Sequence, residues 1–265
     1  MMTELISNKN LLKMMEQKIT KKIRSVFTVK HKEYITPHLI RVVFNMDDEQ
    51  TELLAGVRPG SNNKIFIPVG NDGQETIVRT YTNRKIDLEK NELSVEFVAH
   101  GDNGPASAWA LKAKAGDHLG IGMKESLRPL VPESDCYLLA GDATALPVIS
   151  AILEQLPSEA KAKVFLEVPT KEDELMLCSA ASVETEWLYN PAPEEGSDLA
   201  KQVRAFEFPD DDLKKYVYIA AEYATVKDLR SYYRTDKGWN PREMYACSYW
   251  KAGVSEDEAS EDLKN

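Results

Sequence analysis

The chain has few of the residues that build disulfide frameworks or metal centres. Its 265 residues include three cysteines and four histidines. Cys136, Cys178 and Cys247 are too few and too scattered for a disulfide framework, a zinc site or an iron–sulfur cluster. The histidines show no metal-ligand spacing, and no serine stands in the glycine-flanked turn of a hydrolase nucleophile. We therefore expect neither a resident metal nor hydrolase chemistry.

Long apolar runs are also missing. The N-terminal stretch MMTELISNKNLLKMMEQKITKKIR lacks the continuous apolar region of a signal peptide, and no later run is long enough to span a bilayer. Acidic residues outnumber basic ones 43 to 33, and the net charge of −10 repels nucleic-acid backbones and anionic lipid. We expect a cytoplasmic protein with no nucleic-acid or membrane partner, and a monomer.

The length and the 43% hydrophobic content suffice for one large domain or for two ordinary ones, each with its own core. In the N-terminal extension, residues 1–22, apolar residues recur at near-helical spacing from position 8 and predict an amphipathic helix. Residues 23–132 contain six short apolar stretches separated by Pro, Gly, Asn and Asp, a pattern that favours an antiparallel six-stranded β-barrel.

Residues 133–253 follow a different order, in which strands alternate with helices, beginning with the strand CYLLAG and the helix ALPVISAILEQL. This alternation predicts an α/β domain with a parallel sheet. Within it, NPAPEEGSD at residues 190–198 is typical of a mobile surface loop. Residues 254–265 carry five acids and one lysine, and we expect them to form a solvated acidic tail.

The strand-like stretch IVRTYTNRK, residues 77–85, is the first candidate site. In a strand, Arg79 and Tyr81 point to one face, roughly 7 Å apart, and Thr80, Thr82 and Arg84 point to the other. Arg79 and Tyr81 suit a ligand with an anion and a flat ring, such as a dinucleotide. The alternative is a half-buried strand in which tyrosine and threonine are present because they favour β structure and arginine is present because it keeps the surface soluble.

The stretch VAHGDNGPASAWALKA is the second candidate site, because it passes through two glycines into a helix with Pro105 near its first position. The free N–H groups of Ala106 and Ser107, with the Ser107 hydroxyl, would offer a pyrophosphate the positive end of that helix. The alternative is a plain strand-to-helix turn capped by Asp102 or Asn103.

A third candidate site lies where CYLLAG runs into DATALP, since ligands bind at such strand ends in α/β sheets. Only Gly141 of the three dinucleotide-fingerprint glycines is present, so tight pyrophosphate binding is not supported there. A loosely held, exchangeable nucleotide stays compatible with the sequence.

Four stretches, taken in order, resemble the motifs of the siderophore-interacting proteins, which are flavin-dependent ferric-siderophore reductases of the ferredoxin-reductase superfamily. The four stretches are RTYTNRK, HGDNGPASAWA, AGDATALPVISAIL and YACSYWKAG. The resemblance runs from about Ile23 to Gly253. It implies an FAD-binding barrel and an α/β electron-donor domain. It also implies that the flavin passes single electrons to siderophore-bound Fe(III), which frees iron because the hard oxygen ligands hold Fe(II) more weakly.

The resemblance also implies the cofactor contacts. Tyr81 would pack on the isoalloxazine ring, Arg79 would meet the pyrophosphate, and Thr82 would contact the ring near its reactive nitrogen. The other implied FAD contacts are Thr80, His100, Gly101, Gly104, Pro105, Ala106, Ser107, Asp142, Thr144, Ala145 and Pro147. We expect no catalytic side chain, because the flavin carries the chemistry.

Many ferric siderophores are anionic and the chain is acidic, so substrate binding should need a local basic patch. We nominate Lys64, Arg84, Arg128 and Lys251. Lys64 stands where the family often has a lysine at the pocket, but it would equally suit an exposed strand edge. Trp250 and Tyr249 would either cover the flavin or fill the core.

The electron donor stays open among NADH, NADPH and reduced ferredoxin. Family members commonly have Gly-Glu after the strand that reads YIAAE here, so Ala221 departs from the pattern and Glu222 keeps it. Lys251 is a candidate marker of the ferredoxin-linked kind. Two rival hypotheses are a flavin-dependent ferredoxin or flavodoxin reductase, and a non-catalytic siderophore- or nucleotide-binding protein.

Overall fold

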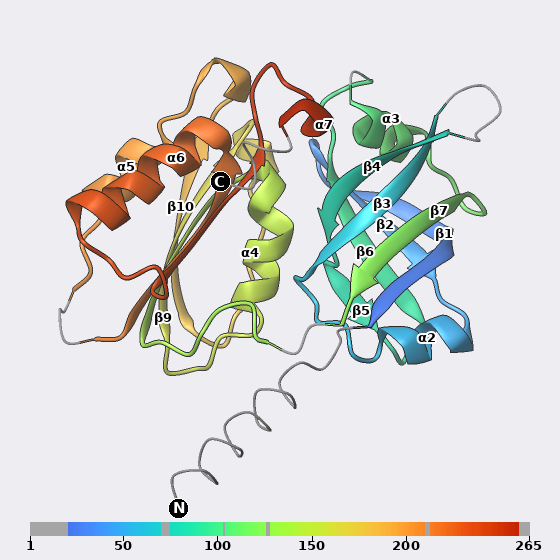
Figure 1. Ribbon diagram of the computed structural model, residues 1–265, viewed down its shortest axis with the longest axis horizontal. Coiled ribbons are helices and arrows are strands. Elements are labelled where there is room, and N and C mark those ends of the chain that lie inside the picture. Colours follow the sequence, from blue (N-terminus) through green and yellow to red (C-terminus); the bar gives the residue numbers. More distant parts are fainter. Residues whose placement is uncertain (1–20, 70–74, 103, 126–127, 210–212, 260–265) are drawn as a thin grey trace, which may run out of the picture.

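The computed structural model describes residues 21–69, 75–102, 104–125, 128–209 and 213–259. Within them the chain forms a seven-stranded antiparallel sheet followed by a five-stranded parallel sheet (Figure 1). This confirms the predicted order of an antiparallel β domain and an α/β domain. The predicted N-terminal helix, residues 8–22, lies outside the described residues except for its end, where Lys22 begins a strand instead.

The antiparallel sheet is curled into a half-barrel (Figure 1). Its strands are β1 (Lys22–Thr36), β2 (Leu39–Asn45), β3 (Asn62–Val69), β4 (Glu75–Thr82), β5 (Lys85–Asp87), β6 (Glu92–Val98) and β7 (His118–Lys124), in the spatial order β4-β3-β7-β1-β2-β6-β5. The sequence predicts six strands, but the described sheet has seven, because the stretch 77–85 is divided between β4 and β5, which pair with different strands. The N–H of Asn83 still bonds to Ser61 O, whereas the N–H of Arg84 bonds to Ser94 O, so the chain crosses from one edge of the sheet to the other.

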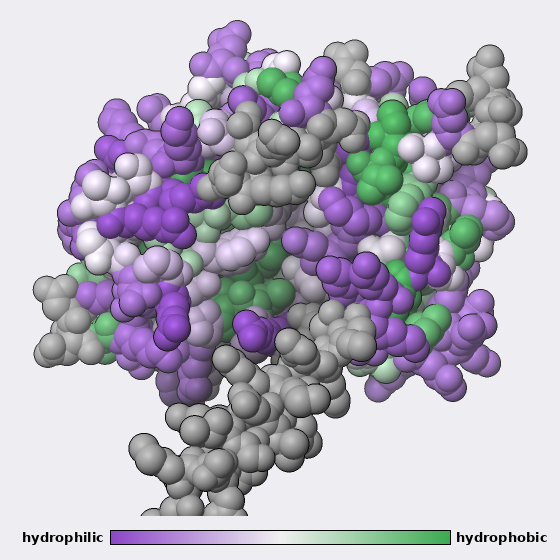
Figure 2. Space-filling view, in the orientation of Figure 1, coloured by the Kyte–Doolittle hydropathy of each residue, from purple (hydrophilic) through white to green (hydrophobic). Residues whose placement is uncertain are grey.

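Alternating apolar residues of these strands fill the core of the half-barrel, with Phe27, Phe44, Ile65, Phe97 and Ile121 fully buried. Helices α2 (Asp48–Leu54) and α3 (Pro105–Lys112) lie at opposite ends of the sheet (Figure 1). On the face shown in Figure 2, hydrophilic residues cover most of the surface and apolar areas are small. The apolar residues are thus kept largely inside the molecule.

The parallel sheet contains β8 (Cys136–Asp142), β9 (Lys161–Val168), β10 (Ser182–Tyr189), β11 (Lys215–Glu222) and β12 (Met244–Trp250), in the order β10-β9-β8-β11-β12. Helix α4 (Leu146–Leu153) lies between this sheet and the half-barrel, and α5 (Leu199–Ala205) and α6 (Tyr223–Ser231) cover the other face (Figure 1). Every residue of α4 is therefore buried. Helix α5, which follows the predicted loop, was not predicted.

The strand order of this sheet has a consequence for ligand binding. From β8 the chain proceeds outward through β9 to β10, and it then returns to place β11 and β12 on the other side of β8. The switch point between β8 and β11 is where parallel sheets of this kind hold ligands, at the carboxyl ends of the strands. Among the described helices, none is long and apolar enough to cross a membrane.

The two domains are joined by both polar and apolar contacts. Asp173, which is 1% exposed, accepts hydrogen bonds from the Thr36 hydroxyl (2.8 Å) and from the backbone N–H of His38 (3.0 Å). Leu39 of β2 packs into the core of the parallel-sheet domain. A Cβ at Gly60, whose φ is +87°, would lie 2.3 Å from Leu130 Cδ1, so only glycine fits this close approach.

The acidic tail departs from expectation where the structure describes it. A short helix, α7 (Glu256–Ala259), follows β12, and Ala259 is 1% exposed. The start of the tail is therefore packed against the molecule rather than wholly solvated.

Candidate functional site

The first candidate site lies on β4, which pairs with β3 in an antiparallel register. Arg79 stands opposite Ile65 and Tyr81 opposite Asn63. Directly opposed residues of an antiparallel pair share a face, so Arg79 and Tyr81 lie on the inner face with these two buried side chains. Thr80 lies on the outer face, opposite Lys64. The predicted faces are confirmed for Arg79, Thr80 and Tyr81, whereas Arg84 lies beyond β4 and bonds to β6.

The two inner-face residues differ in their surroundings. The ring of Tyr81 is half-buried against Phe97, with ring centroids 4.6 Å apart and planes inclined by 37°. The guanidinium of Arg79 is also half-buried, and its Nη1 donates to Val78 O at 2.8 Å. The strand thus presents a cation and an aromatic ring two residues apart on one face, the arrangement that was expected for a flavin nucleotide.

The loop between β6 and α3 uses its polar groups differently from the prediction. The Ser107 hydroxyl accepts from the N–H of His100 (3.1 Å) and donates to Gly101 O (2.8 Å), and Ser107 is 1% exposed. This hydroxyl therefore fastens the loop to the helix in the absence of a ligand. Its expected contact with a pyrophosphate stays a prediction, and it would require the hydroxyl to exchange its bond to Gly101 O.

The N-cap of α3 is Gly104, and it supplies no side-chain hydrogen bond. Asp102 is therefore not the cap, and Asn103 lies outside the described residues. The first turn of α3 contains no acid, so the N–H groups of Ala106 and Ser107 keep a positive potential. A Cβ at position 104 would contact only the ring of His100, an exposed side chain that could turn away, and Gly104 has an ordinary φ of −105°, so this position does not require glycine.

At the third candidate site, the end of β8, the predicted residues contact one another. Asp142 is 6% exposed, and its carboxylate accepts from the N–H (2.9 Å) and the hydroxyl (2.5 Å) of Thr144. It also accepts from the N–H of Glu222 (2.9 Å) and from Nε1 of Trp250 (2.8 Å). Burial raises the pKa of Asp142, and these hydrogen bonds oppose the rise. Asp142 therefore ties together the ends of β8, β11 and β12.

Two further predicted FAD contacts, Ala145 and Pro147, are buried where β8 passes into α4. Gly141 serves the same packing, since a Cβ on it would lie 2.5 Å from the Ala145 Cβ. The single glycine of this stretch is thus explained by close contact between strand and helix.

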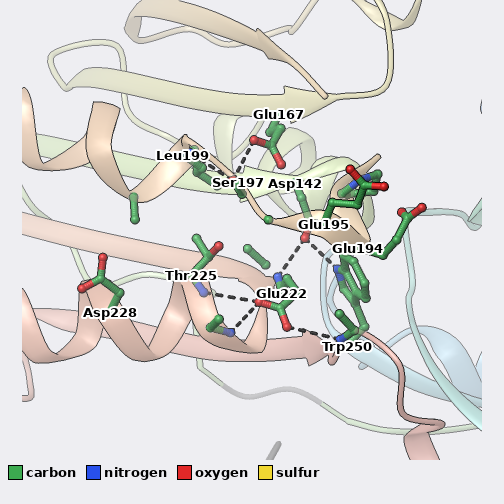
Figure 3. Close-up of a pocket in the computed structure, with 16 residues that line it drawn as sticks. Asp142, Glu167, Glu194, Glu195, Ser197, Leu199, Glu222, Thr225, Asp228 and Trp250 are labelled. Carbon is green, nitrogen blue, oxygen red and sulfur yellow. Dashed lines mark hydrogen bonds between the residues drawn. The ribbon is translucent and has the colours of Figure 1, made fainter. Parts of the chain in front are cut away.

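A pocket of about 350 Å³ opens at the switch point of the parallel sheet (Figure 3). Carboxylates dominate its wall, and none of the described residues that line it is a lysine or arginine. The acidic lining residues are Asp142, Glu167, Glu194, Glu195, Glu222 and Asp228. In the part of the chain that the structure describes, no group of three acidic, histidine or cysteine residues is arranged to hold a metal ion.

Several of these carboxylates are structural. Glu222 caps α6 by accepting from the N–H groups of Ala224 and Thr225, and Glu167 accepts from the Ser197 hydroxyl at 2.7 Å. Burial raises the pKa of Glu167 despite this bond. The sequence predicts the edge of the parallel sheet that contains Asp142 and Glu222, but not the contribution of Glu167 or of the loop acids to the pocket. Their position at or next to the ends of predicted strands is the feature of the sequence that could have indicated it.

The predicted basic residues lie in different places. Lys64 projects from the outer face of β3, and its ammonium donates to the Thr80 hydroxyl. Lys251 follows β12, with its Nζ 4.9 Å from the centre of the Tyr223 ring, and Arg128 is exposed between the two sheets in sequence. The Arg84 side chain is only 12% exposed and forms a two-pronged ion pair with Glu154, at 3.0 and 2.6 Å. Arg84 thus joins the domains and does not supply an open basic patch.

Comparison with known proteins relates these features to a family. The sequence model described as "Siderophore-interacting FAD-binding domain" matches residues 68–124, which include β4 and α3, and the model "Siderophore-interacting protein" matches residues 134–253. The ferric vibriobactin reductase ViuB of Vibrio cholerae is 31% identical over 250 residues, covering 87% of this chain and 90% of that protein.

Solved structures agree with the sequence comparison. The siderophore-interacting protein SipS from Aeromonas hydrophila superposes with a TM-score of 0.78 at 29% identity, over 91% of this chain and 96% of that one. A ferredoxin NADP+ reductase from Neisseria gonorrhoeae shares the fold alone, with a TM-score of 0.59 at 16% identity, over 85% of this chain and 98% of that one. An FAD-binding domain followed by a ferredoxin-reductase-like parallel sheet is the architecture of flavin-dependent oxidoreductases. The chain belongs to the siderophore-interacting protein family.

Proposed function

We propose that the protein is an FAD-dependent reductase that converts siderophore-bound Fe(III) to Fe(II) and so releases iron in the cytoplasm. The observation that carries this proposal is the similarity to a ferric vibriobactin reductase, which extends through both domains over 87% of the chain. The proposed domain boundary, between residues 132 and 133, falls between the last antiparallel strand and the first parallel one. We also propose that the protein acts as a monomer.

The residues around β4 fit an FAD. Tyr81 would lie against the flavin ring, Arg79 would bind the pyrophosphate, and the uncapped, acid-free start of α3 would add N–H donors for the same anion. When bound, FAD supplies the conversion of hydride or single-electron input into single-electron output to iron. The chain's own residues hold and orient that group, and no side chain need act as an acid or base.

The substrate side of the proposal rests on charge. A ferric siderophore that carries negative charge would need cations near the flavin. Lys64 lies on the strand that pairs with β4, opposite Thr80, but on the outer face. We retain Lys251 and Arg128 as further candidates. Arg84 is not proposed for this role, because Glu154 and Glu96 already bind it.

The proposed electron donor is inferred from the negative charge of the residues that line the acidic pocket. A nicotinamide dinucleotide at the switch point would place its pyrophosphate among carboxylates, and NADPH would add a further phosphate. We therefore favour NADH or a reduced carrier such as ferredoxin over NADPH.

The visible absorbance spectrum of the purified protein is the first test, followed by anaerobic addition of NADH, NADPH or reduced ferredoxin. We expect an oxidised-flavin spectrum that one donor bleaches, and then reoxidation by a ferric siderophore with Fe(II) trapped by a coloured chelator. A protein that is colourless and cannot be reconstituted with FAD would leave the binding-protein hypothesis. Reduction of a carrier protein without reduction of ferric siderophore would favour the carrier-reductase hypothesis.

A further inference from the structure

The acidic pocket at the switch point has a neighbouring cavity on the other side of one loop. This second cavity, of about 550 Å³, lies at the carboxyl ends of β9 and β10. The two cavities share part of their lining, namely Glu167, Glu195, Gly196 and Ser197. Residues 190–198, which we call the strap, therefore form the partition between the two cavities.

The strap is held in place by few contacts. None of its residues is buried, so no apolar side chain anchors it in a core. Two side-chain hydrogen bonds hold it to the sheet, and both end on the carboxylate of Glu167. The Ser197 hydroxyl donates to Oε2 at 2.7 Å (Figure 3), and Nδ2 of Asn190 donates to Oε1 at 3.1 Å. A segment with so few buried contacts opens at a low cost in free energy.

Glu167, by contrast, is fixed. It is 4% exposed and pairs within the sheet with Asp142 of β8 and Leu188 of β10. The hydrogen bonds from Ser197 and Asn190 thus connect a loosely packed strap to a rigid carboxylate. When these bonds break, the strap can move while the sheet keeps its shape.

The position of the strap matters for a donor that consists of two nucleotides joined by a pyrophosphate. Each cavity alone has a volume within the range of small-molecule sites, and a dinucleotide can use both only if the strap moves aside. Resting on the donor site of the proposed function, we propose that Ser197 and Glu167 form a latch that determines donor specificity, by holding the strap across the path of a nicotinamide dinucleotide.

The latch acts differently on the two kinds of donor. A dinucleotide binds only the molecules whose strap is open, so its apparent affinity is lowered in proportion to the open fraction. A reduced carrier protein docks on the surface and does not enter the cavities, so the latch leaves its reaction unchanged. The closed strap therefore favours a carrier over NADH.

The test is isothermal titration of the FAD-loaded protein with NAD+ and with 5′-AMP, which needs one cavity only. Ser197→Ala should bind NAD+ about tenfold more tightly than the native protein, the factor that one hydrogen bond contributes, and should bind AMP with unchanged affinity. The gain cannot come from charge, because the substitution leaves every carboxylate of the wall in place.

The matched control is Ser158→Ala, which removes an exposed serine–glutamate hydrogen bond of 2.8 Å outside both cavities. It should bind NAD+ and AMP like the native protein. A second latch variant, Asn190→Ala, removes the other bond to Glu167 and should also tighten NAD+ binding, so the test does not depend on the folding of one variant.

Three results would overturn the latch. They are NAD+ affinity that is equal in the native protein and both latch variants, no binding of NAD+ by any of them, and an equal gain for AMP, which would show an effect confined to one cavity. Reduction of the flavin by reduced ferredoxin should be equally fast in all variants. A protein that takes up no FAD would overturn the proposed function, whereas the two titrations would still decide on the latch.

Discussion

Each side chain of β4 has a defined environment that follows from the face it occupies. Arg79 and Tyr81 share the inner face with Asn63, while Thr80 meets Lys64 on the outer face. A substitution on one face should therefore affect cofactor binding, and a substitution on the other should affect the strand edge or the substrate. This separation allows the two functions to be tested independently.

Replacement of Arg79 by alanine should weaken FAD retention by about 10- to 100-fold, since a hydrogen bond to a charged group contributes about 1.5–3 kcal/mol. The fold should stay intact, because the guanidinium is only half-buried and bonds to a neighbouring carbonyl. Flavin content per polypeptide and the thermal midpoint are the measurements, with exposed Lys85→Ala as the control. Normal flavin occupancy in Arg79→Ala would contradict the assignment.

Between elements, the main ionic link joins the crossover at β4 and β5 to the end of α4. Arg84 pairs with Glu154 beyond α4 and lies 3.6 Å from Glu96 of β6, which is also bound by Arg41 at 2.5 Å. Because Glu96 is 5% exposed, these two arginines compensate the burial of its side chain. The same stretch of sequence thus contributes both to the cofactor strand and to the contact between domains.

Arg84→Met should lower the free energy of unfolding by about 1–3 kcal/mol, since Glu96 keeps Arg41 but loses its second cation. Urea denaturation monitored by circular dichroism would measure the loss. The matched substitution Lys85→Met, at a side chain 63% exposed, should change stability by less than about 0.5 kcal/mol. Equal stability of the two variants would show that the link is dispensable.

For the whole molecule, the relation between the domains depends on a buried carboxylate. Burial alone would raise the pKa of Asp173, but hydrogen bonds from Thr36, His38 and Thr170 outweigh it, and the pKa lies below its ordinary value. A carboxyl group with a depressed folded-state pKa stabilises the fold above its unfolded pKa of about 3.9, and that contribution is lost as pH falls through the folded value.

Asp173→Asn should therefore be less stable than the native protein at pH 7, because the amide accepts fewer and weaker hydrogen bonds from the partner domain. The difference should start to shrink as the pH falls below about 4, and it should be lost once the pH passes below the depressed pKa of the native carboxyl group, where that group becomes protonated. Urea midpoints measured at several pH values would show this convergence. A difference that does not depend on pH would mean that shape, and not charge, holds the contact.

The acidic pocket makes a prediction about donor choice. Reversing two loop charges, Glu194→Lys with Glu195→Lys, should tighten NADP+ binding by roughly tenfold at low salt, and the gain should fall as salt screens the charges. Isothermal titration with NADP+ would measure the change. Glu159→Lys, at an exposed position outside the pocket lining, is the control. No gain in affinity would show that a dinucleotide does not enter this crevice.

Much of the fold could be predicted because strand and helix patterns depend on residues close together in the chain. The period of two along β4 determined which residues share a face, and Pro105 after Gly104 marked the start of α3. The seventh strand was missed because nothing local shows that Arg84 bonds to Ser94 rather than continuing along β3. Helix α5 was missed because its seven residues follow a loop without a side-chain cap.

The two-domain architecture, the family resemblance and the faces of the flavin strand can be read from the order and spacing of residues along the chain. The pairing of polar groups that are far apart in the chain becomes known only from the folded structure. Asp142 meets Trp250 across 108 positions, and Arg84 meets Glu154 across 70. Hydrogen bonds are directional and short, so they depend on the packing that brings distant strands together.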